Sequence, residues 1–215
     1  SATIAYKSPN ACNLCHADKD AAWADQYVRE WRPRDYQAPL LKRASLVDAA
    51  RKRDWSNLPE MLSYVADKDR DVIFATSLIR MVASSGDPRV EPALLEAVRD
   101  PSPLVRSAAV VALQNIPTRE AVQALVVATG DDYRLVRVRA AASLAGVQNL
   151  ALDDAQKKTV AAANEEYLAS ILSRPDQWAS HYNLGNYHLD RRDYKQAVAS
   201  YDTALKLEPR AVLAM

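Results

Sequence analysis

The chain has 215 residues, and its 28 Lys and Arg against 27 Asp and Glu give a formal net charge of +1. This balance argues against a nucleic-acid-binding protein, and no apolar run reaches the roughly 18 residues that a membrane span needs. A hydrophobic content of 49%, with four glycines and one phenylalanine, predicts an all-helical chain that forms one elongated domain or two small ones.

The first segment, residues 1–37, contains both cysteines of the chain, in the sequence Cys12-Asn13-Leu14-Cys15-His16. This spacing is typical of covalent attachment of a c-type haem. Two thiols at the opening of a helical turn can each form a thioether with a haem vinyl group, and the imidazole of His16 then becomes the proximal ligand of the haem iron.

Three alternatives explain the same cysteines: a redox dithiol, half of a zinc site, or a chance pair. A zinc site needs four ligands, and His181 and His188 lie far away in a different repeat. A redox dithiol needs a strand–helix context, and no strand pattern is visible here. Covalent haem is therefore the favoured interpretation.

A helix is expected from Ala17 to Trp31, where Trp23, Tyr27 and Trp31 share one face at i, i+4 and i+8. Two interpretations remain open. The aromatic face is either a wall beside the porphyrin or, slightly favoured, ordinary packing against the following helices. Pro33 ends this helix, and another is predicted over 40–53, with its basic side solvated.

Residues 38–150 contain a repeat. Three aspartates recur 33 and 31 residues apart, and each is followed five positions later by a valine: Asp67 and Val72, Asp100 and Val105, Asp131 and Val136. Self-similarity at this period predicts stacked helix pairs. The three units, covering roughly 57–148, resemble HEAT repeats, in which two helices flank a tight turn that contains an aspartate.

Two ion pairs are expected along the turns of these units, Asp100 with Arg106 and Asp131 with Arg137. The first unit has Ile73 at the arginine position and should lack its pair. The alternative is that these charges are simply solvated, since exposed ion pairs contribute only about 0–1 kcal/mol to stability.

Residues 177–215 follow a different pattern, with Leu184-Gly185, Ala197, Tyr201, Ala204 and Pro209 at the spacings of a tetratricopeptide (TPR) unit, which they resemble closely. A lone TPR unit buries too little surface to be stable without neighbours. Its open end should therefore bind a partner. The side chains expected to contact a protein partner are Asn183, Asn186 and Tyr187.

Residues 151–176 connect the two patterns. Shifting the TPR positions back by 34 residues places Tyr167, Ile171 and Pro175 on Tyr201, Leu205 and Pro209. Residues 154–173 therefore read as the second helix of an earlier TPR unit. We expect this helix to pack on the HEAT-like stack with one face and on the TPR unit with the other. Residues 211–215 are expected to begin a further helix.

The order of haem motif, HEAT-like array and TPR unit resembles the C-terminal part of a family of bacterial multihaem c-type cytochromes. The resemblance implies thioethers at Cys12 and Cys15, and His16 as proximal ligand. Because covalent haem attachment takes place outside the cytoplasm, we expect a fragment of a longer secreted precursor with a periplasmic or other extracytoplasmic location. The distal ligand is expected from the upstream haem region. Within this chain the candidates are Met61, Met81, His181 and His188.

The predicted fold class is all-α: a right-handed α-α superhelix, or solenoid, of HEAT-like helix pairs, followed by a TPR unit. The predicted function is electron transfer by covalent haem c, with the repeats placing it against redox partner proteins. The alternative is a protein-interaction scaffold that grips a protein or peptide, with the haem peripheral or absent. Catalysis is not expected, because no catalytic triad, metal cluster or phosphate-binding loop is visible.

Overall fold

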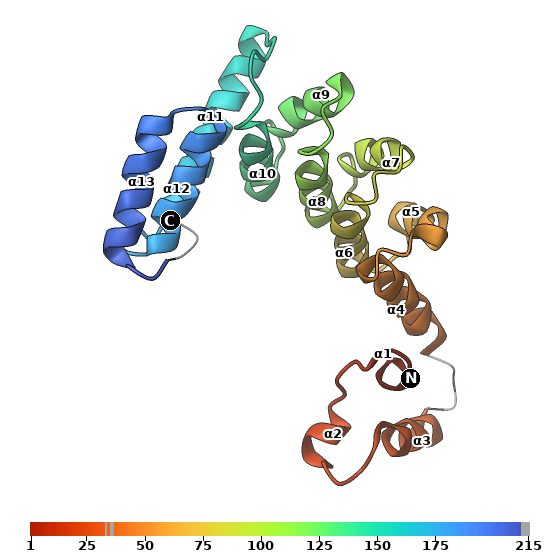
Figure 1. The fold of residues 1–215 in the computed structure, drawn as a ribbon. Helices are drawn as coiled ribbons and strands as arrows, with labels where there is room; N and C mark the ends of the chain where they lie inside the picture. The colour runs from red at the N-terminus through yellow and green to blue at the C-terminus, as the bar shows by residue number, and fades with distance from the viewer. Residues whose placement is uncertain (33, 35–36, 212–215) are drawn as a thin grey trace. The chain divides into compact units, whose positions relative to one another are not determined.

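The computed structural model describes residues 1–32, 34 and 37–211, and no strand occurs in these ranges, which confirms the all-α prediction (Figure 1). The helices are α1 Ala2–Tyr6, α2 Cys12–Cys15, α3 Ala21–Trp31, α4 Gln37–Arg51, η1 Trp55–Asn57 (a 3₁₀ turn), α5 Leu58–Ala66, α6 Val72–Val82, α7 Val90–Ala97, α8 Pro103–Leu113, α9 Arg119–Ala128, α10 Arg134–Leu144, α11 Asp154–Ile171, α12 Trp178–Asp190 and α13 Tyr194–Leu207. Apart from Ala211, the helix expected over 211–215 falls outside the described residues.

The chain divides into two compact units, Ser1–Ser85 and Gly86–Met215. The division falls inside the predicted HEAT-like array. The first helix pair, α5 and α6, belongs to the first unit, and the pairs α7–α8 and α9–α10 belong to the second.

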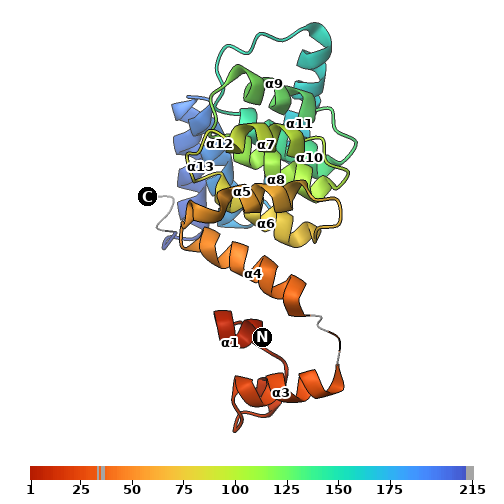
Figure 2. The same ribbon diagram turned by 90° about the vertical axis from the view of Figure 1, so that its right-hand side faces the viewer.

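The core of the first unit lies among α4, α5 and α6. Helix α6 contacts both of the others (Figure 2). The side chains buried there to 2% exposure or less include Leu46, Leu58, Met61, Leu78 and Ile79. Burial of several large aliphatic side chains is what holds such short helices together, since helices of this length are marginal alone in water.

Helix α4 has one basic side chain that is not simply solvated as predicted. Arg43 is half-buried, with its guanidinium 5.0 Å from the centre of the Phe74 ring and 3.5 Å from a carboxylate oxygen of Asp71. Asp71 also caps α6 by accepting from the backbone N–H of Ile73 at 2.9 Å. Arg43 thus ties α4 to the start of α6.

In the second unit, α8 and α10 are the second helices of neighbouring repeats and pack side by side (Figure 1). Their facing surfaces are rich in buried alanines: Ala108, Ala109, Ala112, Ala140 and Ala141. Small side chains let two helices approach closely. The buried Ser143 hydroxyl can therefore reach the backbone carbonyl of Val110 in the neighbouring repeat, at 3.4 Å.

Helix α11 contacts α9 and α10 as well as α12, which is the placement expected for the connecting helix (Figure 2). Its start is fixed by a capping box between Asp153 and Gln156. A small core joins the two patterns, in which Ala145 after α10, Ile171 of α11 and Tyr187 of α12 are buried together.

The last two helices, α12 and α13, form an antiparallel pair (Figure 1). Gly185 is buried in the middle of α12 and faces the ring of Tyr201 on α13. The Tyr201 hydroxyl donates to the side-chain oxygen of Asn186 at 2.8 Å. The absence of a side chain on Gly185 thus lets the Tyr201 ring pack closely against α12.

Candidate functional site

The cysteine segment forms the single turn α2, which begins at Cys12 and ends at Cys15. The side-chain oxygen of Asn10 accepts from the backbone N–H of Asn13 at 3.0 Å and so caps the turn. The two sulfurs are three positions apart on this turn and thus lie on the same side of it. Cys12 is half-buried and Cys15 is exposed.

A second asparagine fixes the loop that follows. The Asn13 side chain donates to the backbone carbonyls of Lys19 at 2.8 Å and Asp20 at 3.3 Å. Asp20 then caps α3 by accepting from the backbone N–H of Trp23 at 2.8 Å. Because Asp20 caps the helix, α3 begins at Ala21, whereas the periodicity predicts a start at Ala17. The same loop places His16 against α3.

His16 opens a row of aromatic rings along α3. Ring centres are 4.9 Å apart from His16 to Trp23, 5.1 Å from Trp23 to Tyr27 and 6.0 Å from Tyr27 to Trp31. Tyr27 is 39% and Trp31 is 70% exposed. The slightly favoured interpretation, core packing of this face against later helices, is therefore wrong for Tyr27 and Trp31, because solvent reaches both rings.

A cavity of about 290 Å³ lies between α2 and α3. Its lining consists of Ala11, Cys12, Cys15, His16, Ala24 and the three aromatic residues of α3. Two thiols and one imidazole thus face one mostly apolar hollow. This donor set fits a covalently held haem, which needs two sulfur nucleophiles one turn apart and an axial nitrogen directly after them.

Neither Met61 nor Met81, the two candidate distal ligands in the same compact unit, lines this cavity. Met61 is completely buried in α5 and Met81 is half-buried in α6. His181 bonds to the backbone carbonyl of Pro175 at 2.8 Å, and the ring of His188 lies on that of Tyr187 at 5.4 Å. Each of the two histidines thus has a local structural contact of its own.

The zinc alternative finds no donor set around the two cysteines. In residues 1–32, 34 and 37–211, no group of three or more His, Cys, Asp and Glu side chains is arranged to hold a metal ion.

Over the same residues, no helix combines the length and the apolar character needed to cross a membrane.

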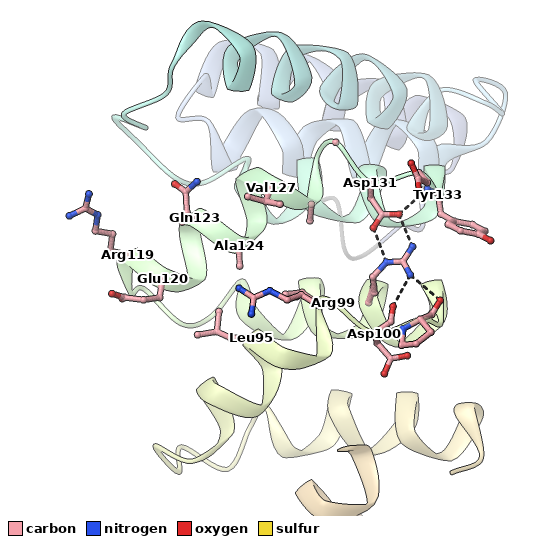
Figure 3. Close-up of a pocket in the computed structure, with 16 residues that line it drawn as sticks. Leu95, Arg99, Asp100, Arg119, Glu120, Gln123, Ala124, Val127, Asp131 and Tyr133 are labelled. Atoms are coloured by element: carbon pink, nitrogen blue, oxygen red, sulfur yellow. Dashed lines mark hydrogen bonds and ion pairs between the residues drawn. The ribbon is translucent and has the colours of Figure 1, made fainter. Parts of the chain in front are cut away.

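The turns of the second unit carry an arginine ladder, formed by Arg106 with Asp131 and Arg137 with Glu166. Nε and Nη2 of Arg106 donate to the two carboxylate oxygens of Asp131 at 2.7 and 2.9 Å (Figure 3). Nη2 of Arg137 donates to Glu166 of α11 at 2.7 Å. The predicted partners, Asp100 for Arg106 and Asp131 for Arg137, are thus wrong by one repeat.

Each ladder arginine contacts its own turn through backbone oxygens instead. Arg106 donates to the carbonyl of Asp100 at 2.8 Å, and Arg137 donates to that of Asp131 at 2.8 Å. The aspartate side chains meanwhile hold the turns, since Asp131 accepts from the backbone N–H of Tyr133 at 2.8 Å. Burial, the largest single influence, raises the pKa of Asp131, but the hydrogen bonds from Arg106 and from the backbone of Tyr133, together with the charges of Arg106 and Arg137, lower it on balance.

A cavity of about 1020 Å³ lies along α7 and α9 and reaches the ladder (Figure 3). Its lining mixes both signs of charge, with Arg99 and Arg119 beside Glu120 and Asp132. Val127, which is 67% exposed, adds an apolar side chain to the same surface. No residue of this surface was predicted to contact a protein partner, because the lining residues come from separate helices and turns.

Comparison with protein-family models gives two matches. A model of HEAT repeats matches residues 58–145, and a model of the tetratricopeptide repeat matches residues 178–210. The chain carries HEAT repeats and a TPR. Searches of curated proteins and of solved structures found no match.

Within the TPR, the three predicted contact residues lie in different environments. Asn183 is exposed on α12. Tyr187 is 5% exposed and its hydroxyl donates to the side chain of Asn164 on α11 at 2.9 Å, so it belongs to the core. Asn186 is half-buried and accepts from Tyr201. Of the three, Asn183 alone is exposed to solvent.

Proposed function

We propose that this chain is a protein-interaction scaffold that presents the surfaces of its HEAT repeats and TPR to partner proteins. The observation that supports it is the combination of both repeat types with open cavities between their helices, about 1020 Å³ along α7 and α9 and about 640 Å³ beside α10. Stacked helical repeats create extended surfaces suited to protein partners.

The ladder supports this function by making the surface rigid. Arg106 joins the second and third HEAT units, and Arg137 joins the third to α11. A surface that is ordered before binding loses less conformational entropy when a partner docks. The repeats therefore offer a preformed site rather than one that must fold on contact.

Site-specific photo-crosslinking in living cells tests the scaffold proposal. A photoreactive phenylalanine replaces Val127 or Leu135, which line the two cavities, and Leu189 is the control because it is 46% exposed but lines neither. We expect discrete crosslinked products at the first two positions and none at the control. The identified partner should then bind the purified chain. Equal labelling at all three positions would contradict the proposal.

A second function, electron transfer through a covalent haem c, is supported by one observation. Cys12, Cys15 and His16 line a single apolar cavity that continues along the aromatic rings of α3. When bound, such a haem supplies one-electron redox chemistry. In this proposal the two thiols tether the group, His16 binds its iron, and the aromatic row excludes water from one edge.

This second proposal carries further expectations from the resemblance to multihaem c-type cytochromes. Thioether formation takes place outside the cytoplasm, so the mature chain would be periplasmic and its partners would include redox proteins. The missing sixth ligand would come from an upstream haem region. An aromatic row exposed on α3, with Trp31 70% exposed, offers a surface for that region to cover.

Maturation in a bacterial periplasm with a c-haem assembly system tests the haem proposal. We expect a Soret band that survives acid–acetone extraction and a mass increase of one haem. Cys12→Ala with Cys15→Ala should abolish both, while His181→Ala, which removes a histidine bonded to Pro175, should change neither. A periplasm-matured chain without covalent haem would refute this function and leave the scaffold proposal standing.

A further inference from the structure

A groove of about 640 Å³ lies where the HEAT repeats meet the TPR, between α10, the end of α11 and the start of α12. We call it the junction groove. Its residues include Arg134 and Arg139 of α10, Arg174 after α11, and Asn183 of α12. Arg174 lies outside both family matches, which end at residue 145 and begin again at residue 178. The groove therefore belongs to neither repeat alone.

The charge of the junction groove has one sign. Three arginines, Arg134, Arg139 and Arg174, line it, and no described lining residue is an aspartate or glutamate. Arg139 and Arg174 are both exposed. Arg134 is already engaged by Glu166, because its Nη2 donates to the backbone carbonyl at 3.2 Å and its Nε lies 3.9 Å from a carboxylate oxygen.

Carboxylates also lie near the groove without lining it. Glu166 forms ion pairs with Arg137 at 2.7 Å and with Arg134 of the groove at 3.9 Å. Asp190 is close enough to Tyr167 to affect its pKa, which is raised mainly by burial and further by the negative charge of Asp190. Among the described residues, no hydrogen bond or ion pair joins Glu166 or Asp190 to the guanidinium group of Arg139 or Arg174.

Apolar side chains also line the groove. Leu135, which is 41% exposed, lies beside Val138, Ala142 and Tyr167. The exposed amides of Gln177 and Asn183 complete the lining and can donate to a peptide backbone. A lining of aliphatic side chains, arginines and amide donors is the composition that recognises a short peptide carrying both acidic and aliphatic side chains.

The larger cavity along α7 and α9 provides the contrast. There Arg99 and Arg119 lie among Glu120 and Asp132, and Arg106 is committed to Asp131. A site of mixed charge does not select for a partner of one sign. Selection for acidic side chains is thus a property of the junction groove and not of the repeat surface in general.

We propose that the junction groove binds an acidic linear segment of a partner protein, with an aliphatic side chain of that segment on Leu135 and its carboxylates at Arg139 and Arg174. This inference rests on the proposed scaffold function and names the class of partner. Complementary charge attracts the segment and sets its register, and burial of the aliphatic side chain holds it.

Fluorescence anisotropy with labelled twelve-residue peptides tests the proposal. The full chain should bind a peptide of Glu, Asp and Leu and should not bind the matched peptide with Lys in place of the acids. In Arg139→Glu with Arg174→Glu, we expect the affinity to fall at least about tenfold, since each opposed charge adds repulsion. Arg119→Glu, a single charge reversal on the other cavity, is the control and should leave the affinity unchanged.

Four outcomes would overturn the proposal. Two concern the peptide: the acidic peptide does not bind, or its affinity falls equally in the Arg119→Glu control. The other two concern different ligands: an RNA oligonucleotide or anionic vesicles bind more strongly than the peptide, or the chain associates with itself in a way that the double variant abolishes. Leu135→Ser separates the apolar contribution, and it should weaken the peptide without changing the dependence of binding on salt.

The experiments distinguish failure of the groove proposal from failure of the scaffold proposal. Crosslinking from position 127 reports on the HEAT surface, which the two charge reversals do not touch. If crosslinks at 127 persist while the acidic peptide does not bind, the scaffold stands and the groove assignment falls. If no crosslinks form at any position, the scaffold function falls as well.

Discussion

Replacing Gly185 by alanine is expected to destabilise the α12–α13 pair by about 2 kcal/mol. A Cβ atom at this position would lie 2.3 and 2.5 Å from two ring carbons of Tyr201. The ring must move, and with it goes the hydrogen bond from its hydroxyl to Asn186. Overpacking of about 1–3 kcal/mol and a lost hydrogen bond of about 1 kcal/mol outweigh the roughly 1 kcal/mol that alanine gains in helix propensity.

Hydrogen exchange of the α13 backbone amides is the suitable measurement, because a chain of several units need not unfold in one step. Gly130→Ala is the control, since its Cβ would meet atoms only at 3.6 and 3.8 Å, an ordinary contact distance. Faster exchange confined to α12 and α13 is expected for Gly185→Ala alone. Unchanged exchange in that variant would show that Tyr201 moves aside at no cost.

Replacing Arg106 by alanine is expected to destabilise the second unit by about 3 kcal/mol. The guanidinium makes two bonds to Asp131 and two to the backbone carbonyls of Asp100 and Pro101, and both charged side chains are only 13% exposed. Removal leaves a largely buried carboxylate without its cation, which is more costly than the loss of an exposed pair. Chemical denaturation followed by circular dichroism measures the change.

Arg99→Ala is the matched control. Its guanidinium is 76% exposed and lies 3.5 Å from Glu96, so its loss should cost less than about 1 kcal/mol. Similar losses in the two variants would mean that the ladder contributes no more than a solvated ion pair does.

The pH dependence of stability gives an independent check of Arg106. The pKa of Asp131 is lowered in the folded chain, so its stabilising contribution is present above the unfolded pKa of about 3.9 and is lost as the pH falls through the folded value. In Arg106→Ala, burial acts without the compensating hydrogen bonds, and the pKa of Asp131 should rise. A carboxyl titration by NMR that shows no rise would contradict the assigned pairing.

Much of the fold follows from the sequence, because helix pairs leave a repeated signature. The spacing of Asp67, Asp100 and Asp131 marks the three turns, and the pattern around Gly185 and Tyr201 marks the TPR. Recurrence reveals which positions are equivalent between repeats. It does not reveal which neighbour a long side chain reaches, so the ladder pairs were misassigned by one repeat.

The reason for that misassignment is physical. Asp131 already accepts from the backbone of its own turn, and the arginine of the same unit satisfies itself on backbone carbonyls. The free end of its guanidinium therefore extends to the next unit. Glu166 takes the place of the missing next aspartate without lying at the repeat spacing, and no periodic pattern could have identified it.

The cysteine motif identifies Cys12, Cys15 and His16, which line one cavity, but the sequence left open whether the aromatic face of α3 lies beside them. The motif names Cys12, Cys15 and His16, whereas the alignment of His16 with the aromatic face of α3 depends on the loop that Asn13 holds. The junction groove had no sequence signal at all, because Arg139, Arg174 and Asn183 come from three different segments. Convergence of distant residues is the part of a site that sequence patterns describe least.

Glu166 has a consequence for how such arrays are assembled in evolution. The third HEAT repeat accepts α11 as its neighbour through one carboxylate that meets Arg137 at 2.7 Å, together with the small core around Ile171. We therefore expect that another helical module can follow the array if its first helix carries a carboxylate opposite Arg137 and a few aliphatic side chains beside it. Chimaeras that exchange the TPR for another helical module behind an intact Glu166 should keep the ion pair with Arg137, provided that the new module supplies an apolar side chain in place of Tyr187.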